Sequence, residues 1–302
     1  MPSLGNRLRL GDDVARALEH GGAVVGLETA VLTHGLPEPQ NLSALRAMMA
    51  AVEGRGAVPA VCLTLAGELW IGAGWKQIET VARAPHRIKV GVDGLAAALV
   101  ANAPGGLTVS GTLAALQARG IRVFATGGIG GVHAGVQETG DVSADLHQLA
   151  RSTVIVVTAG AKSILDIPRT AEYLETLGIP VLGYRSSTLA GFYLTSSGLS
   201  IRQVESVTDI AEIARVHWAL GAASGVLVSN PLQAAEALEQ EGWQGWLDEA
   251  HRQARAQGVH GKDVTPFLLE QVGILSEGRT IEANLRLLRH NAEVAAEVAV
   301  AL

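Results

Sequence analysis

The sequence predicts an α/β fold in which a central, mostly buried β-sheet is flanked by helices, with a helical C-terminal region in the same domain. Short runs rich in Val, Ile, Leu and Ala recur along the chain, and each is followed by a turn that contains glycine. Segments with apolar residues at spacings of three and four then follow these turns. Continuous apolar runs are typical of strands covered on both faces, so the alternation predicts βα units around one sheet.

Six apolar runs are expected to form the core strands, at residues 23–27, 58–65, 123–126, 154–157, 181–184 and 225–228. The amphipathic segments between them predict helices at residues 12–19, 41–55, 111–119, 168–177 and 209–220. Pro168 is suited to the first turn of its helix, and Asp166 is placed to cap it. The C-terminal third is expected to be helical at residues 234–238, 246–257, 266–276 and 281–302. No repeat or linker marks a boundary, so residues 1–302 are expected to form a single domain.

The charge of the chain argues against a polynucleotide partner. The formal net charge is -6, from 23 basic and 29 acidic residues, and no run of Lys and Arg provides the basic surface that nucleic-acid binding needs. A small phosphorylated metabolite stays open, because one anionic group needs only a local cluster of donors.

Cysteine usage and hydropathy favour a cytoplasmic protein without a membrane segment. Cys62 is the only cysteine, which excludes an intrachain disulfide and indicates a reducing compartment. The N-terminus lacks the apolar core of a signal peptide, and Asn102 and Pro104 interrupt the apolar stretch near residues 95–118. No membrane association is therefore expected.

A glycine-rich loop from Thr126 to His133 follows one of the expected strands. Its backbone N–H groups could cradle an anion, with Thr126 and His133 assisting, and a tight turn that needs positive φ angles explains the glycines equally well. The glycine spacing differs from the dinucleotide-binding fingerprint and from the Walker loop, which argues against nicotinamide and nucleoside-triphosphate chemistry.

Two carboxylates follow this loop, at Asp141 and Asp145. One turn of helix would hold both on the same face, where magnesium or manganese could bind while keeping many water ligands. The local pattern favours a simpler interpretation for Asp141, which would cap a helix that begins near Ser143.

Lys162 and Glu28 are candidates for chemistry because each stands at the end of an expected strand. An amine among small groups near a helix start can have a lowered pKa, which would leave Lys162 nucleophilic enough for a Schiff base. Glu28 precedes an irregular loop at residues 29–41 and could exchange protons if partly buried. Taken alone, each is more often a solvated side chain, and Lys89, Thr108 and Asn284 carry no signal of their own.

The chain from near Asp12 to the C-terminus resembles the pseudouridine-5'-phosphate glycosidase family. The resemblance rests on five segments in order, at residues 27–41, 124–133, 141–146, 159–170 and 261–267, the last followed by Ala283 and Asn284. It implies an enzyme that cleaves pseudouridine 5'-phosphate reversibly into uracil and ribose 5-phosphate. It further implies a homotrimer assisted by manganese or a similar divalent cation.

The resemblance also implies a role for each residue that matches a family segment. Lys162 is similar to the nucleophile that joins ribose C1' after the sugar ring opens, Glu28 to the proton donor and acceptor, and Asp141 to the metal ligand. The other matching residues are expected to bind substrate: Ser143, Ala144 and Asp145 at the uracil and sugar, Lys89, Thr126, His133 and Asn284 at the phosphate, and Thr108 and Val109 beside them.

Three departures from the family pattern leave room for a different C-glycoside. Ala134 stands where the family usually has arginine, Ala30 stands where it often has a second threonine, and residues 186–197 differ in detail. A related synthase or lyase that acts on another aromatic base is therefore the alternative activity.

Overall fold

The computed structural model describes residues 7–259 and 264–302. Its strands are β1 (Leu8–Leu10), β2 (Val24–Leu27), β3 (Val58–Leu65), β4 (Glu68–Ile71), β5 (Ile88–Val90), β6 (Gly105–Leu107), β7 (Val123–Ala125), β8 (Ile155–Thr158), β9 (Val181–Tyr184), β10 (Arg202–Val204) and β11 (Val226–Ser229). Its helices are α1 (Asp12–Glu19), η2 (Val31–Gly35, a π-helix), α2 (Gln40–Glu53), α3 (Trp75–Arg83), α4 (Leu95–Val100), α5 (Val109–Gln117), α6 (Val136–Thr139), α7 (Ala144–Leu149), α8 (Ile167–Thr176), α9 (Val207–Ala219), α10 (Gln240–Ala256), α11 (Val264–Leu275) and α12 (Arg279–Ala301).

The strands form one sheet with a parallel centre, which confirms the predicted fold class. The order β3-β2-β7-β8-β11-β9-β10 is parallel throughout. Strands β4 and β6 both pair with β3 in the antiparallel sense, and they carry β1 and β5 at their outer sides. All six predicted core strands are present. The strands that the sequence did not predict are short and each contains a charged residue or glycines, so no apolar run marks them.

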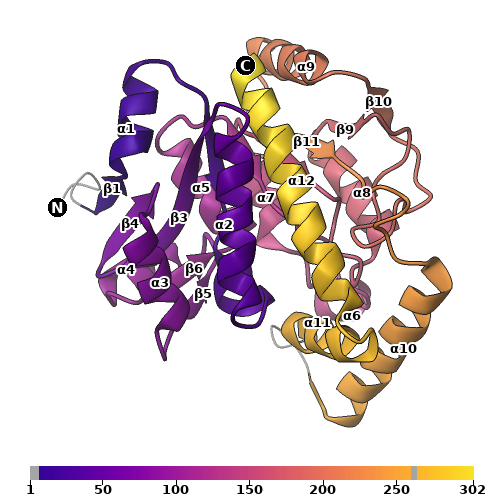
Figure 1. The fold of residues 1–302 in the computed structure, drawn as a ribbon. Helices are drawn as coiled ribbons and strands as arrows, with labels where there is room; N and C mark the ends of the chain where they lie inside the picture. The colour runs from indigo at the N-terminus through magenta and orange to yellow at the C-terminus, as the bar shows by residue number, and fades with distance from the viewer. Residues whose placement is uncertain (1–6, 260–263) are drawn as a thin grey trace.

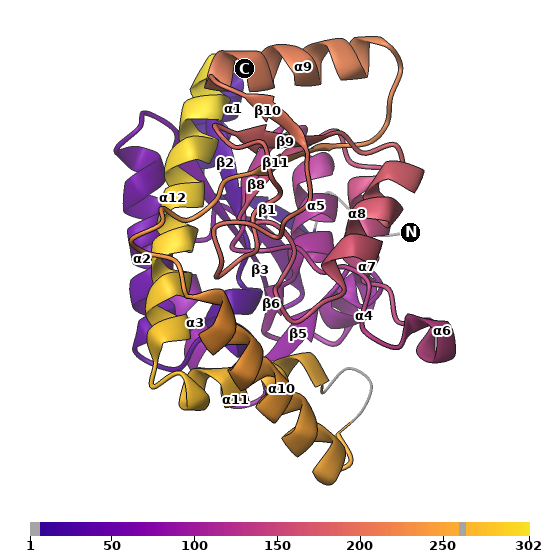
Figure 2. The same cartoon turned by 90° about the vertical axis from the view of Figure 1, so that its right-hand side faces the viewer.

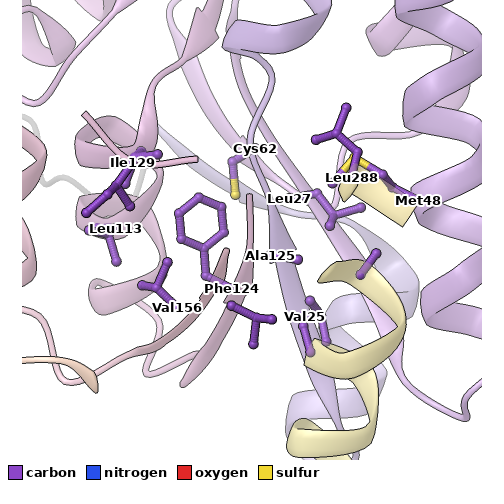
Figure 3. Packing of buried hydrophobic residues seen from close by; sticks show 14 of the residues in the cluster. Val25, Leu27, Met48, Cys62, Leu113, Phe124, Ala125, Ile129, Val156 and Leu288 are labelled. Carbon is purple, nitrogen blue, oxygen red and sulfur yellow. The ribbon is translucent and has the colours of Figure 1, made fainter. Parts of the chain in front are cut away.

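Helices cover both faces of the sheet, as Figures 1 and 2 show from two directions. Helices α2 and α12 lie together on one face, while α5, α7 and α8 lie on the other. Figure 3 shows Leu27 directed toward Met48 of α2 and Leu288 of α12, and Phe124 on the side of Leu113 of α5. Strand β2 passes so close to α5 that a Cβ at Gly26 would collide with the Leu116 side chain, which explains the glycine at this position.

Two predicted helices and one predicted loop need correction. Residues 234–238 form a turn, and α10 begins at Gln240, before the predicted start at residue 246. The loop predicted at residues 29–41 contains the π-helix η2 and the first residues of α2. Helices α3, α4 and α6 were not predicted; they have nine, six and four residues, so their periodicity is weak. The helix expected to begin near Ser143 is present as α7, which begins at Ala144.

The parallel strands bring their carboxyl ends to one edge of the sheet. Glu28 follows β2, Thr126 follows β7, and Lys162 comes four residues after β8. Helix α11 packs against both η2 and α12 at this edge, next to α10 (Figure 1). The predicted cap is confirmed, since Asp166 accepts a hydrogen bond from the Arg169 N–H at 3.1 Å. Within the described ranges, no helix is long and apolar enough to cross a membrane.

Candidate active site

A cavity at the carboxyl edge of the sheet brings together four of the predicted site residues. Four residues line it: Glu28 directly after β2, Lys89 of β5, Lys162 in the segment after β8, and Asn284 of α12. The topology explains why these residues lie close together, because parallel strands end at the same edge of the sheet. Ligands of open α/β sheets bind at this edge. Residues that are far apart in sequence thus supply one carboxyl, two amines and one amide.

Glu28 is buried, with 6% of its surface exposed. The hydroxyl of Thr126 donates a hydrogen bond to its Oε1. Burial raises the pKa of the Glu28 carboxyl, against the opposing effect of the Lys162 charge and the Thr126 hydrogen bond. A carboxyl group that keeps its proton above the ordinary range is suited to donate that proton and take it back.

Lys162 is held by the backbone on both sides of its side chain. Its N–H donates to the carbonyl of Ile129 at 3.1 Å, and its carbonyl accepts from the Leu165 N–H at 3.0 Å. Residue Ala161 forms a β-bridge with Ile129, which ties the segment to the glycine-rich loop. The amine therefore comes from a fixed backbone just before α8 and reaches the cavity that Glu28 lines.

Lys89 gives the cavity its second amine. It lies at the middle of β5, opposite Gly106 of β6. Burial lowers the pKa of the Lys89 amine, and the nearby positive charge of Lys162 lowers it further, while Asp145 and Glu28 act in the opposite direction. Two amines that repel each other across a cavity favour an anionic ligand between them.

The glycines of the loop from Thr126 to His133 are required by close packing. None of Gly127, Gly128, Gly130 and Gly131 has a positive φ, so the tight-turn explanation of these glycines is wrong. A Cβ at Gly128 would lie 2.5 Å from the Phe192 ring, and a Cβ at Gly127 would lie 3.1 Å from Leu287 of α12. Gly127 and Gly128 line the cavity, and among the described residues nothing accepts a hydrogen bond from their N–H groups. These two donors suit an anion.

Asp145 binds backbone groups from two elements. It is 7% exposed, its Oδ1 accepts from the Ser110 N–H, and its Oδ2 accepts from the Gly130 N–H, each at 2.8 Å. The carboxylate therefore joins the first turn of α5 to the glycine-rich loop. Its charge still reaches the cavity, where it raises the pKa of both Glu28 and Lys89.

The arrangement predicted for Asp141 and Asp145 is wrong. Helix α7 begins at Ala144, and its cap is Ser143, whose Oγ accepts from the Asp145 N–H at 3.2 Å. Asp141 lies before the helix, so it is not the cap, and the two carboxylates do not share a helical turn. Val142, beside Asp141, instead forms a bridge with Val132 in the glycine-rich loop.

Asp141 pairs with His133 near the surface. The Asp141 side chain is 46% exposed, and its Oδ2 lies 3.9 Å from Nδ1 of His133, which is 22% exposed. Burial lowers the pKa of the His133 imidazole, and Lys162 and Lys89 lower it further, whereas Asp141 raises it. No group of three metal-binding side chains occurs in the described part of the chain. One carboxylate fits a hard cation that keeps most of its water, and it does not fit a closed protein cage.

The remaining predicted residues lie around α5 and α7. Thr108 caps α5 by accepting from the Gly111 N–H at 3.3 Å, and its hydroxyl lies 3.0 Å from that of Ser110. Val109 is buried, Ser143 is half-buried, and Ala144 is exposed. Thr126 is fully buried against Glu28, so its hydroxyl does not line the cavity. None of these five residues is among those that line the cavity in the part of the chain that the structure describes.

The cavity also has walls that the sequence analysis did not single out. His34 of η2 lines it, with Nδ1 placed 2.8 Å from the Thr33 hydroxyl. Phe192, Tyr193 and Leu269 supply apolar surface from the segment after β9 and from α11. A π-helix often marks a functional site, but nothing in residues 31–35 distinguishes it from a loop before the backbone is seen.

The chain is a member of the α/β enzymes described as indigoidine synthase A like proteins. The model of that family matches residues 13–301. A protein of Dinoroseobacter shibae named pseudouridine-5'-phosphate glycosidase is 44% identical over 291 residues, which cover 96% of this chain and 95% of the relative. A protein of the same name from Sorangium cellulosum is 43% identical over 302 residues, covering 99% and 95%. The chain belongs to the pseudouridine-5'-phosphate glycosidase family.

Solved structures give the same fold. The crystal structure of the prealnumycin C-glycosynthase in complex with ribulose 5-phosphate has a TM-score of 0.91 and 34% identity, covering 98% of this chain and 96% of that one. An indigoidine synthase A like protein from Thermotoga maritima has a TM-score of 0.85 and 34% identity, with 92% of each chain covered. Part of the segment 261–267, which contributed to the resemblance, lies outside the described residues.

Proposed function

We propose that this chain cleaves the carbon–carbon bond between uracil and ribose in pseudouridine 5'-phosphate, releasing uracil and ribose 5-phosphate. The observation that carries the proposal is the shared cavity of Glu28 and Lys162, with Lys89 beside them. A binding protein for phosphosugars would need the amines but would have no use for a buried carboxyl with a raised pKa.

The chemistry needs an electron sink because carbon stands on both sides of the bond to be broken. An ordinary glycosidase protonates a heteroatom leaving group, which this substrate lacks. In the proposed reaction, the bond between C1' and the ring oxygen breaks, Glu28 protonates that oxygen, and the neutral Lys162 amine bonds to C1'. The nitrogen then returns a proton to the Glu28 carboxylate, which restores the lone pair on nitrogen. The nitrogen lone pair then forms an iminium bond to C1', while the electrons of the broken bond go to uracil C5, which takes up a proton. Water hydrolyses the iminium ion, and each step can run in reverse.

The phosphate would bind to hydrogen-bond donors that line the cavity. Lys89, the Asn284 amide and the free N–H groups of Gly127 and Gly128 are the donors at hand. The resemblance implies His133 as a further donor. It also implies Thr126, but the Thr126 hydroxyl is buried and donates to Glu28 instead. An anion held by fixed donors orients the rest of the substrate, which supports proximity of C1' to the Lys162 amine.

Asp141 is proposed to hold manganese or a similar divalent cation. The exposed carboxylate and the imidazole of His133 would position a cation that keeps water ligands, and its charge would favour anionic groups of the substrate. A homotrimer in the cytoplasm completes the proposal, and light scattering at known concentration tests the assembly.

Two measurements on the wild-type protein test the proposed function. Release of uracil from pseudouridine 5'-phosphate is expected with manganese present. Borohydride reduction in the presence of ribose 5-phosphate should then leave the sugar on Lys162, located by peptide mass spectrometry, while the exposed Lys76 of α3 serves as an internal control. A folded protein that releases no uracil would reject the substrate, and an unmodified Lys162 would reject the covalent route.

A second candidate function is C-glycoside chemistry on another aromatic base. The similarity to the prealnumycin C-glycosynthase supports it, as do the apolar walls that Phe192 and Leu269 give the cavity. Synthesis in the reverse direction separates the two candidates. If ribose 5-phosphate couples to other aromatic acceptors much faster than to uracil, the second function holds.

A further inference from the structure

Asn291 of α12 is a buried polar residue with no role in the chemistry described above. It is 0% exposed, and it lies seven residues after Asn284, two turns along the same face of the helix. Asn284 lines the cavity, but Asn291 does not. Buried amides are retained with their hydrogen bonds satisfied, so the partners of Asn291 indicate what it holds in place.

The partners of Asn291 fix the orientation of its amide. Its Nδ2 lies 2.8 Å from the carbonyl oxygen of Thr126, and a carbonyl only accepts, so the NH2 group must face Thr126. Its Oδ1 accepts from Nδ2 of Asn230 at 3.0 Å. The Asn230 N–H in turn donates to the carbonyl of Thr158 at 2.8 Å. Asn291 therefore connects the ends of β7, β8 and β11 from the side of α12.

Thr126 extends this network to the acid–base residue. Its N–H donates to the carbonyl of Val157 at 3.1 Å and its own carbonyl accepts from Asn291, so the backbone is held from both sides. Its hydroxyl donates to Glu28. Thr126 is 0% exposed and Glu28 is 6% exposed, so water could not easily replace that hydrogen bond if Thr126 moved.

We propose that Asn291 is a positioning residue, which holds the Thr126 backbone from α12 and so keeps the Thr126 hydroxyl on the Glu28 carboxyl. The inference rests on the proposed function only in giving Glu28 a role in proton transfer. Asn291 does not itself line the cavity. Its Nδ2 lies 2.8 Å from the Thr126 carbonyl oxygen and, more weakly, 3.5 Å from that of Gly127, so it holds the start of the glycine-rich loop chiefly at Thr126.

The surroundings of Glu28 set the direction of the expected effect. Its carboxyl faces the Thr126 hydroxyl after β7, Lys162 after β8, Asp145 of α7 and Lys89 of β5. Burial raises the pKa of Glu28 most, and among the opposing influences the Thr126 hydrogen bond lowers it. Loss of that hydrogen bond therefore raises the pKa further, and the carboxyl stays protonated to higher pH.

Infrared difference spectroscopy can follow this protonation without turnover, from the spectrum of each protein minus that of its Glu28→Gln counterpart. Asn291→Ala is expected to move the titration midpoint to higher pH. Thr126→Val removes the hydroxyl itself and should move the midpoint in the same direction at least as far. In the double variant, Asn291→Ala should add no further shift, because its effect passes through that hydroxyl.

A matched control separates positioning from a general loss of packing. Val298→Ala also truncates a fully buried side chain of α12, and it should lower the melting temperature without moving the midpoint. An unchanged midpoint in folded Asn291→Ala, or an additive shift in the double variant, overturns the proposal. If Asn291→Ala does not fold, Asn230→Ala removes the other partner of the amide, and it should give a smaller shift upward. An unchanged titration midpoint in Asn230→Ala would also overturn the proposal.

Measurements of uracil release distinguish a failure of this proposal from a failure of the proposed function. If the wild type releases uracil, Asn291→Ala should lower kcat by about tenfold, with KM little changed. A loss of about tenfold is the effect expected when the hydrogen bond from the Thr126 hydroxyl to the Glu28 carboxyl is weakened. If the wild type releases no uracil, the proposed function fails, while the infrared titration still decides whether Asn291 controls Glu28.

Discussion

Glu28 and Asp141 are both carboxylates of the candidate site, but their surroundings are opposite. Glu28 is 6% exposed, accepts a hydroxyl hydrogen bond and lines a cavity with two amines. The Asp141 side chain is 46% exposed, and Nδ1 of the His133 imidazole lies 3.9 Å from its Oδ2. Environment assigns different chemistry to the same functional group. The buried carboxyl suits proton transfer, and the exposed one suits a cation that remains hydrated.

The largest expected effect on kcat comes from Lys162, which lines the cavity together with the buried Glu28. Lys162→Ala should lower kcat by roughly a thousandfold or more, because it removes the proposed covalent bond to C1'. Substrate affinity should change far less, since Lys89 and Asn284 remain in the cavity. Steady-state kinetics and equilibrium binding measure the two quantities. Lys76→Ala, at an exposed position of α3, is the matched control and should behave as wild type. Near-normal turnover by Lys162→Ala would remove the lysine from the mechanism.

Glu28→Gln should have the next largest effect, a loss of about 10²- to 10⁴-fold in kcat, because a general acid and base is removed. The free energy of unfolding should respond differently from kcat, because it should favour the variant increasingly as the pH rises. The folded pKa of Glu28 is raised above its ordinary value of 4.5, so the wild type holds its proton more tightly when folded. Its stability relative to the glutamine variant is therefore greatest below pH 4.5 and declines as the pH rises through the raised pKa.

Denaturant unfolding of wild type and Glu28→Gln at a series of pH values measures this decline. The difference in the free energy of unfolding should move in favour of the variant as the pH increases. A constant difference across the range would show that the Glu28 carboxyl titrates alike in the folded and unfolded chain, and the contrast with Asp141 would then disappear.

The sequence was sufficient for the parallel core and for the strand-end positions of Glu28 and Lys162. Apolar runs of four or more residues are a local property, and parallel strands bring their carboxyl ends to one edge wherever they lie in the chain. The pairing partners of a polar side chain are not local. Asp145 meets Ser110 and Gly130 only after α5, α7 and the glycine-rich loop have packed together, so a helical spacing from Asp141 gave the wrong geometry.

Asp145→Ala should destabilise the fold more than it changes the chemistry directly. The change leaves the N–H groups of Ser110 and Gly130 buried without their acceptor, which costs about 1–3 kcal/mol for each unsatisfied group. Asp145→Asn keeps one acceptor oxygen, so its loss of stability should be smaller. Urea unfolding of both variants checks the order. Equal stability of Asp145→Ala and wild type would mean that the carboxylate does not hold the loop to α5.

The smallest effect is expected on the exposed side, at Asp141. Asp141→Asn keeps the shape of the side chain but removes its negative charge and leaves one neutral oxygen ligand, so the manganese concentration for half-maximal uracil release should rise about tenfold or more. Saturating manganese should restore most of the activity, because Glu28 and Lys162 are untouched. His133→Gln provides a comparison at the neighbouring donor. Wild-type activity that a strong chelator leaves unchanged would remove the cation from this edge of the site, and Asp141 would then differ from Glu28 only in contacting solvent.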